Sequence, residues 1–222
     1  MHKNVKRGIA LLLCILTIMG AFVCNAENPE EGGVQQDIPA SEVVNLDVDD
    51  YAKYIKNNDI KTATETISVN LDTFIGSNTN ATLTDGVIDW SDGLGNITFN
   101  ANITVSAIYE MQIVWMPKNA GIDPKLGVMI DGKYPFSEAA KIELKREWKN
   151  ISEKPRVDAS GNEYAQEQVE TGEYVTSILQ DYSGANTDPY KFKLTEGSHT
   201  VTLVNSKQPI LIKEIKFVAP EN

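Results

Sequence analysis

Aromatic residues near predicted turns are the side chains of this sequence best suited to binding a ligand. Proteins bind sugars by stacking an aromatic ring against the apolar C–H face of the sugar, while amides and carboxylates hydrogen-bond its hydroxyl groups. The chain therefore offers a candidate carbohydrate site, although each Trp could instead fill a hydrophobic core. The candidates, all near turns or strand ends, are Trp90, Tyr134, Trp148, Tyr182, Tyr190 and Asn205.

Catalytic residues are harder to find than binding residues. His199 is the only histidine after residue 26, and no cysteine follows that residue. A Ser-His-Asp or Cys-His apparatus would depend on His199 alone, and no G-x-S-x-G, H-E-x-x-H or Walker-type loop occurs. A glycosidase needs only two carboxylates, but the 31 acidic residues single out no pair. We expect His199 to be a strand-edge residue and the chain not to be an enzyme.

Two oxygen-rich segments raise the question of a calcium ion. "DASGNE" begins at Asp158, and "LDVDDY" begins at Leu46. Neither has the Gly and the terminal Glu where an EF-hand loop requires them. We interpret the first segment as an Asx-turn and the second as a helix N-cap. The alternative, that the domain binds a structural calcium ion, stays open.

Residues 1–26 are typical of a signal peptide. A basic start precedes a short apolar run at 9–19, and small residues lead to a cleavage site after Ala26. Lipid attachment at Cys24 is the alternative to clean cleavage. We expect a secreted protein, or one held at the cell surface, with no membrane span after cleavage. Both cysteines lie in this segment, so the remaining chain has no disulfide.

The chain after residue 26 divides into a linker and one domain. Residues 27–48 are acidic, rich in Gly and Pro and without periodicity, and predict a flexible linker; residues 49–222 form the domain. Cleavage of the signal peptide would remove three basic residues and change the net charge from −11 to −14. This charge argues against nucleic-acid partners and anionic membranes, and it suits neutral sugars, cations or basic partners.

The hydrophobic pattern predicts an all-β domain behind one helix. Tyr51, Tyr54 and Ile55 have helical spacing after Asp49-Asp50, which predicts a short N-terminal helix. From Thr64 onward, short runs with a period of two are separated by turn signals such as Asp131-Gly132. About eight to ten such strands without a long helical pattern predict a β-sandwich or barrel.

Alternation along two strands predicts which residues face the core. In the run from Ile108 to Trp115, the clear core face carries every second residue: Tyr109, Met111, Ile113 and Trp115. In the last strand the apolar phase changes near Lys213, which predicts a β-bulge there.

Several segments, taken in order, resemble a known family. They are "YAKYI", "GVIDWSDGLGNITFNANI", "YEMQIVWMP", "MIDGKYPFSEAAKIELKREWKN", "DASGNEYAQEQVE" and "DPYKFKLTEGSHTVTLVNSKQPILIKEIKF". Together they are similar to the galactose-binding-like jelly-roll domain at the N-terminus of extracellular solute-binding proteins of Gram-positive sugar ABC transporters. The resemblance covers the chain from Tyr51 to Val218. Its most specific parts are the block from Ile130 to Trp148, which includes Arg146, and the strand entry at Gly197.

The resemblance implies an all-β jelly-roll β-sandwich with a short N-terminal helix. In related sugar modules the ligand lies in a cleft at the loop end of the sandwich, between aromatic walls and an Asn that precedes the last strand. On this sequence Asn205 corresponds to the Asn. Trp90, Tyr134 and Trp148 correspond to the walls, whereas the neighbouring Phe136 is expected to pack in the core.

The resemblance also bears on metals and partners. The calcium-binding acids of the related modules correspond most nearly to Glu65 and Glu214. In the family a two-lobed solute-binding region follows the jelly roll. Within the jelly roll, the segment after "GNE" usually carries an Arg-Pro pair, which is replaced here by Ala165-Gln166. The resemblance therefore implies a partner that is a carbohydrate or a sugar-uptake protein, rather than solute capture by this chain alone.

Three hypotheses follow from these observations. The first is a secreted or surface-held, non-catalytic module that binds carbohydrate or assists an extracellular sugar-uptake system. The second is a structural or protein-interaction jelly roll whose aromatic residues all lie in the core. The third, with the least support, is a carboxylate-based glycosidase.

Overall fold

The computed structural model describes residues 47–58 and 61–221 of the 222-residue chain. The predicted signal peptide, the lipidation candidate Cys24 and the linker up to residue 46 lie outside the described residues. No helix of the described part is long and apolar enough to cross a membrane.

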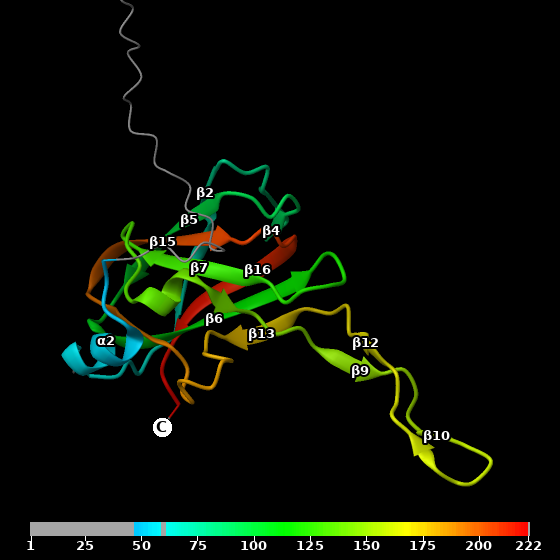
Figure 1. The fold of residues 1–222 in the computed structure, drawn as a ribbon. Helices are drawn as coiled ribbons and strands as arrows, with labels where there is room; N and C mark the ends of the chain where they lie inside the picture. Colours follow the sequence, from blue (N-terminus) through cyan, green and yellow to red (C-terminus); the bar gives the residue numbers. More distant parts are fainter. Residues whose placement is uncertain (1–46, 59–60, 222) are drawn as a thin grey trace, which may run out of the picture. The chain divides into compact units, whose positions relative to one another are not determined.

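The described residues form one α-helix, one 3₁₀ helix and sixteen strands (Figure 1). The helices are α2 (Tyr51–Asn57) and η1 (Ser137–Ala140). The strands are β1 (Ile67–Ser68), β2 (Asn70–Ser77), β3 (Thr82–Thr84), β4 (Val87–Trp90), β5 (Asn96–Ile103), β6 (Ala107–Pro117), β7 (Lys125–Ile130), β8 (Ile142–Glu143), β9 (Trp148–Asn150), β10 (Arg156–Val157), β11 (Glu163–Tyr164), β12 (Gln168–Glu170), β13 (Val175–Ile178), β14 (Lys191–Leu194), β15 (Gly197–Asn205) and β16 (Ile210–Val218).

Two antiparallel sheets make up the domain. The first has the order β13-β6-β16-β4-β3, with β14 also pairing β6 and β1 pairing β16. The second has the order β2-β5-β15-β7-β8. The chain changes sheet from β4 to β5, from β5 to β6, from β6 to β7, from β14 to β15 and again to β16. This crossing between two packed antiparallel sheets is the jelly-roll arrangement, and the predicted all-β class is confirmed.

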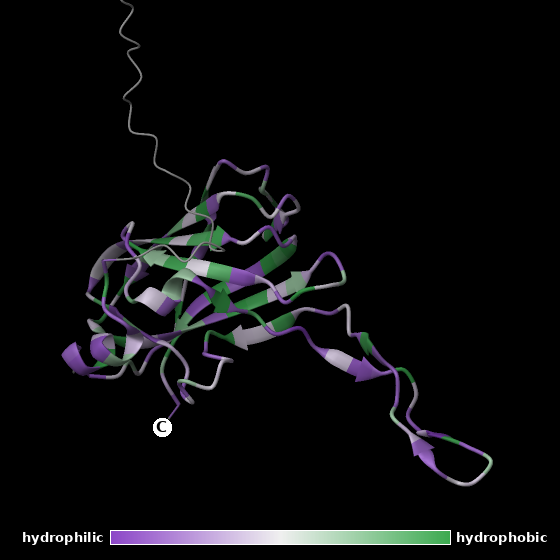
Figure 2. Ribbon diagram, viewed as in Figure 1, coloured by the Kyte–Doolittle hydropathy of each residue, from purple (hydrophilic) through white to green (hydrophobic). Residues whose placement is uncertain are grey.

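Side chains from both sheets form one hydrophobic core. β6 contributes Tyr109, Met111, Ile113 and Trp115 from one sheet, all fully buried as the alternation predicted. The facing sheet contributes Ile97, Phe99, Val201 and Leu203. Figure 2 shows apolar residues running through the strands, whereas much of helix α2 is hydrophilic. With no disulfide among the described residues, burial of these apolar surfaces is the main stabilising term.

The predicted bulge in the last strand is confirmed. β16 pairs β6 with Ile212 opposite Trp115 and Glu214 opposite Val114, so the register shifts across Lys213. The extra residue explains why the apolar phase of the sequence changes there.

Helix α2 also forms where the sequence predicts it, and aromatic rings fix it to the sandwich. The Asp50 carboxylate accepts a hydrogen bond from the Lys53 N–H at 2.8 Å, which caps the helix. The Tyr51 ring packs edge-on against Phe136, with 4.8 Å between centroids. Its hydroxyl accepts a hydrogen bond from the Lys191 N–H at 3.0 Å, and burial raises the pKa of Tyr51 to about 12. Phe136 is fully buried, as predicted.

Residues 147–171, named here the ribbon segment, pair with themselves. β9 pairs β12, and β10 pairs β11, in two short ribbons apart from the two large sheets (Figure 1). Four of the large apolar side chains that the described chain exposes lie in this segment: Trp148, Ile151, Val157 and Tyr164.

Candidate functional site

The structure places Trp90 in the core rather than on a binding surface. Its side chain is 0% exposed, and its Nε1–H donates to the Leu94 carbonyl at 2.7 Å. A ring with no exposed face cannot stack on a sugar. The expectation that Trp90 is a sugar-binding wall is corrected, because the side chain belongs to the hydrophobic core.

Tyr134 is also buried, with 6% of its surface exposed. It lies over Gly127 of β7: a Cβ at that position would be 3.0 Å from the Tyr134 hydroxyl. The missing side chain of Gly127 thus makes room for the ring, and burial raises the pKa of Tyr134. Tyr134 fills this space instead of lining an open site, which corrects the second expected wall.

Asn205 stabilises the loop that precedes the last strand. Its side-chain NH₂ donates to the Gln208 carbonyl at 3.0 Å, and its Oδ1 accepts from the Gln208 N–H at 3.1 Å. With 3% of its surface exposed and both amide ends engaged, Asn205 offers no free group to a ligand in this structure.

Trp148 is the one predicted wall that remains exposed, at 51%. It belongs to β9 of the ribbon segment, opposite Glu170 of β12. The four residues of the predicted carbohydrate site are therefore not brought together: three are buried and the fourth lies on a different sheet.

The acids considered for calcium are engaged separately. Glu65 accepts from the Thr104 hydroxyl at 3.3 Å, and Glu214 pairs with Lys216 at 2.8 Å. Asp158 accepts from the Ser160 and Asn162 N–H groups in the Asx-turn that the sequence predicts. Across residues 47–58 and 61–221, no group of three or more His, Cys, Asp or Glu side chains is placed to hold a metal ion.

His199 connects the start of β15 to the turn after β7. Its Nδ1 lies 2.6 Å from Asp131 Oδ2 and its Nε2 lies 2.8 Å from the Thr195 carbonyl oxygen. Both partners are acceptors, and the protonated imidazolium satisfies both with its two N–H donors. Burial alone would lower the pKa of His199, but these hydrogen bonds outweigh it and raise that pKa. The arrangement is structural, as expected for a strand-edge residue.

The turn that His199 holds has the geometry its sequence predicts. Asp131 and Gly132 have φ values of 51° and 74°, and Ile130 and Lys133 exchange backbone hydrogen bonds at 2.9 and 3.1 Å. Positive φ at both central residues is the reason for an Asp-Gly pair in a two-residue hairpin turn.

A cleft of about 340 Å³ lies between the β7–β8 edge and the loop that follows β13. The chain supplies one wall from Lys125 and from residues 141–143, and the other from residues 180–183 together with Tyr190. Tyr190 is buried and burial raises its pKa, whereas Tyr182 is 41% exposed at the rim. Both tyrosines are among the candidates that the sequence offered.

Strand pairing holds the second wall in place. β13 pairs β6, and the Leu179 N–H donates to the Met111 carbonyl at 2.9 Å. The Tyr190 N–H then donates to the Leu179 carbonyl at 2.8 Å, which closes the loop at its base. Within the loop, Asp181 accepts from the Ser183 and Asn186 N–H groups, and the hydrogen bonds from Ser183 are foremost in lowering its pKa.

Charged groups on the first wall are largely paired with one another. Glu143 forms ion pairs with Lys125 at 3.3 Å and with Lys145, which also pairs with Asp123 at 2.9 Å. The hydrogen bond from Lys145 lowers the pKa of Glu143, and the same bond raises the pKa of Lys145. The Lys145 ammonium also lies 5.4 Å from the centroid of the Tyr182 ring.

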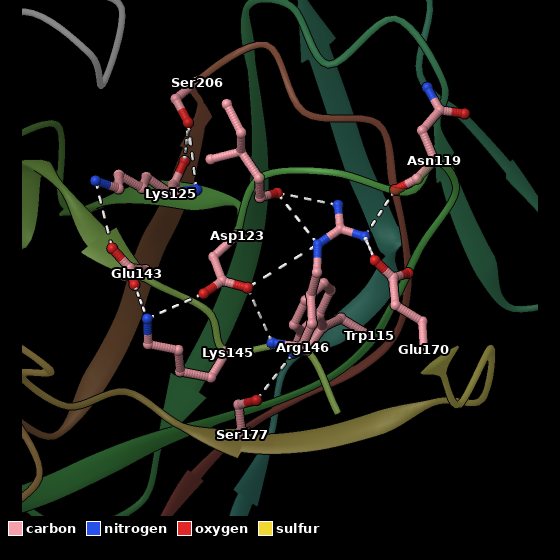
Figure 3. A network of polar contacts seen from close by, with 11 residues as sticks. Trp115, Asn119, Asp123, Lys125, Glu143, Lys145, Arg146, Glu170, Ser177 and Ser206 are labelled. Carbon is pink, nitrogen blue, oxygen red and sulfur yellow. Dashed lines mark hydrogen bonds and ion pairs between the residues drawn. The ribbon is translucent and has the colours of Figure 1, made fainter. Parts of the chain in front are cut away.

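Behind this wall lies a buried arginine (Figure 3). The guanidinium of Arg146 donates to the carbonyl oxygens of Asn119, at 2.7 Å, and of Ile122, at 3.0 Å. It also pairs with Glu170 of the ribbon segment at 2.7 Å. The Arg146 N–H donates to Asp123 at 3.2 Å, so the same carboxylate contacts both Arg146 and Lys145. Arg146 thus joins the loop before β7, the cleft wall and the end of β12.

Two polar side chains of the cleft remain available to a ligand. Among the described residues, no hydrogen bond or ion pair engages the side chains of Lys141 or Gln180. Together with the exposed Tyr182 ring they form a hydrogen-bonding amide, a cation and an aromatic face around one cavity. This combination can bind a small polar ring compound by stacking and by hydrogen bonds to its substituents.

Comparisons with known proteins find similarity only among solved structures. No protein-family model matches the chain, and no curated protein matches it. A family 35 carbohydrate-binding module from Clostridium thermocellum is similar, with a TM-score of 0.37 and 14% identity, over 72% of this chain and 96% of that chain. CBM35 from Cellvibrio japonicus Abf62 has a TM-score of 0.34 and 10% identity, over 73% of this chain and 94% of that chain.

An enzyme with an attached module is similar as well. The GH26-CBM35 β-(1,4)-mannanase of Podospora anserina has a TM-score of 0.43 and 12% identity over 72% of this chain. The match covers 29% of the mannanase chain, so this chain spans less than a third of that protein's length. Similarities of this size do not identify a ligand or a binding residue.

Proposed function

We propose that this domain is a non-catalytic carbohydrate-binding module and that the cleft beside Tyr182 receives the glycan. The observation that carries the proposal is the exposed Tyr182 ring next to two unengaged polar side chains, Lys141 and Gln180, around one cavity. The proposal rests on this geometry and not on the degree of similarity to the modules named above.

The chemistry of the cleft suits a sugar ring. The apolar C–H face of a sugar would stack on the Tyr182 ring. The Lys145 ammonium, 5.4 Å from the ring centroid, forms a cation–π contact with the same ring. The Gln180 amide can donate to one hydroxyl and accept from another, and Lys141 can donate to a third. The ion pairs of Glu143 hold the wall in place without using the two free groups.

We propose a wider setting for the module from the sequence. The pattern of residues 1–26 supports secretion or attachment at the cell surface, and the resemblance over Tyr51 to Val218 supports an association with extracellular sugar uptake. In that setting the module would hold a glycan, or a sugar-uptake protein, close to the cell.

A structural or protein-interaction domain is the second candidate. The observation in its favour is that two of the three predicted aromatic walls, Trp90 and Tyr134, are buried. The exposed apolar side chains of the ribbon segment would then be available to a protein partner.

A glycan array probed with residues 27–222 separates the two candidates. We expect the wild type to bind at least one class of glycan, and Tyr182→Ala to weaken that binding by about tenfold or more, which corresponds to about 1.4 kcal/mol. Gln180→Ala tests the amide in the same way. Tyr174→Ala is the matched control, because Tyr174 is an exposed tyrosine beside Lys213 that does not line the cleft.

The outcomes distinguish the candidates. Selective loss in the Tyr182 and Gln180 variants supports the carbohydrate module. Absence of binding to every glycan by a folded wild-type domain rejects it and leaves the structural candidate. Equal losses in the Tyr182 and Tyr174 variants show that the cleft is not the site.

A further inference from the structure

We propose that Lys145 is a positioning residue of the cleft, whose ammonium group holds the Tyr182 ring in the orientation that receives the sugar. Lys145 does not line the cleft itself, so it affects the ligand through Tyr182. This role rests on the proposed function and adds to it the contact that orients the binding ring.

The two walls of the cleft belong to different sheets. On the first wall β8 pairs β7, whereas residues 180–183 of the second wall follow β13, which pairs β6. Among the described residues, no hydrogen bond or ion pair joins residues 141–145 to residues 180–183. The Lys145 ammonium lies over the Tyr182 ring, 5.4 Å from its centroid. This cation–π contact therefore links one wall to the other.

The Tyr182 side chain has no other contact of this kind to fix it. It is 41% exposed, and within the described part of the chain its one hydrogen bond, ion pair or ring contact is that with Lys145. The backbone beneath it is fixed, since Asp181 accepts from the Ser183 and Asn186 N–H groups at 2.7 and 2.8 Å. An exposed side chain without partners populates several rotamers, and ordering it on binding costs affinity. A cation over one ring face reduces this cost and leaves the other face to the sugar.

Lys145 can hold the ring because its own ammonium is held. The ammonium lies 2.9 Å from Asp123 Oδ2 and also pairs with Glu143 (Figure 3). Asp123 in turn accepts from the backbone N–H of Arg146 at 3.2 Å, and the Arg146 side chain is 2% exposed. Two carboxylates therefore position the ammonium, and a buried residue positions one of them.

A direct hydrogen bond from Lys145 to the sugar is the competing explanation, since an ammonium has three N–H donors. The two roles differ in one respect that can be measured. An effect that acts through Tyr182 disappears when the Tyr182 ring is removed, whereas a direct contact with the sugar persists. A double-mutant cycle isolates this difference.

The test is an NMR titration of residues 27–222 with oligosaccharides of mannan, xylan and galactan, which also measures weak binding. We expect Lys145→Met to weaken binding about three- to fivefold, the size typical of an exposed cation–π contact. Lys145→Arg should stay within about twofold of the wild type, because a guanidinium can stack on the ring and pair with the carboxylates. In the Tyr182→Leu background, Lys145→Met should change the affinity by less than about 1.5-fold.

A matched control and a sugar-free measurement complete the test. Lys213 lies 5.4 Å from the centroid of the Tyr174 ring, and neither residue lines the cleft. Lys213→Met therefore removes the same kind of contact elsewhere and should leave the affinity unchanged. Without sugar, the Tyr182 ring should shift the Lys145 Hε signals upfield, and Tyr182→Leu should abolish this shift.

Four outcomes would overturn the proposal. If Lys145→Met weakens binding equally in both backgrounds, Lys145 contacts the sugar directly. If Lys145→Met binds as the wild type does, or Lys145→Arg binds as weakly as Lys145→Met, the cation does not position the ring. If the upfield shift is absent while sugar binding still depends on Tyr182, this role fails and the proposed function stands. If the shift is present but no oligosaccharide binds, the proposed function fails and the role in binding fails with it.

Discussion

Replacement of Arg146 by methionine should destabilise the domain strongly. The Arg146 side chain is 2% exposed and pairs with Glu170 at 2.7 Å (Figure 3). Methionine has a similar length but no donors, so Arg146→Met leaves the Glu170 carboxylate and the carbonyl oxygens of Asn119 and Ile122 without their partner.

The expected loss follows from the burial of this ion pair. Removing one partner of a buried pair costs about 3–5 kcal/mol, mainly because the remaining charge stays desolvated. Domains of this kind have total stabilities of about 5–15 kcal/mol. At about 2–4 °C per kcal/mol for this size, the melting temperature should fall by roughly 6–20 °C.

Urea denaturation followed by circular dichroism measures this loss directly. Glu170→Gln is the informative companion, because it keeps a hydrogen-bond acceptor and removes the charge; we expect a smaller loss of about 1–3 kcal/mol. Lys145→Met is the control for a partly exposed lysine in the same network, with an expected change within about 1 kcal/mol. A loss below about 1 kcal/mol in Arg146→Met would refute the view that Arg146 holds the cleft wall and the ribbon segment together.

Three further predictions concern individual side chains. The pKa of Glu110 is raised, foremost by burial, so Glu110→Gln should raise stability at neutral pH, and the gain should disappear as the pH falls below the ordinary glutamate value. The raised pKa of His199 and the lowered pKa of Asp131 predict that the wild type exceeds His199→Gln in stability most between about pH 4 and 6.5. This advantage should decline as the pH rises through the raised pKa of His199; an unchanged difference up to pH 9 would contradict it. Gly127→Ala should lower the free energy of unfolding by about 1–3 kcal/mol, because its Cβ would lie 3.0 Å from the Tyr134 hydroxyl; thermal melts test it, and an unchanged melting temperature would refute the packing argument.

Local features were predictable because each depends on a few adjacent residues. Asp50 caps helix α2, Asp131-Gly132 forms the hairpin turn, and the register shifts at Lys213, all as the sequence indicated. The inward face of β6 could be predicted for the same reason, since alternation along one strand is a property of that strand alone.

The burial of Trp90 and Tyr134 could not be read from their neighbours along the chain. Trp90 stands at the end of β4, and whether a strand end is covered depends on the opposite sheet. Tyr134 follows an exposed turn, but the space it fills exists because Gly127, on the preceding strand, has no side chain. Both placements depend on packing between segments that only the folded chain brings together.

The cleft shows the same limitation more strongly. Tyr182 could be selected as an aromatic residue in a turn-rich loop, but its polar neighbours Lys141 and Glu143 are about forty residues away along the chain. They meet only because β8 joins the edge of β7 while β13 pairs β6 in the other sheet.

Isothermal titration calorimetry tests the central claim most directly. A glycan that binds the wild type on the array is titrated into the wild type, Tyr182→Phe and Tyr182→Ala. Stacking on the ring predicts that Tyr182→Phe binds within about threefold of the wild type, while Tyr182→Ala binds at least about tenfold more weakly. Equal affinities of the alanine variant and the wild type would contradict a carbohydrate site in the cleft beside Tyr182.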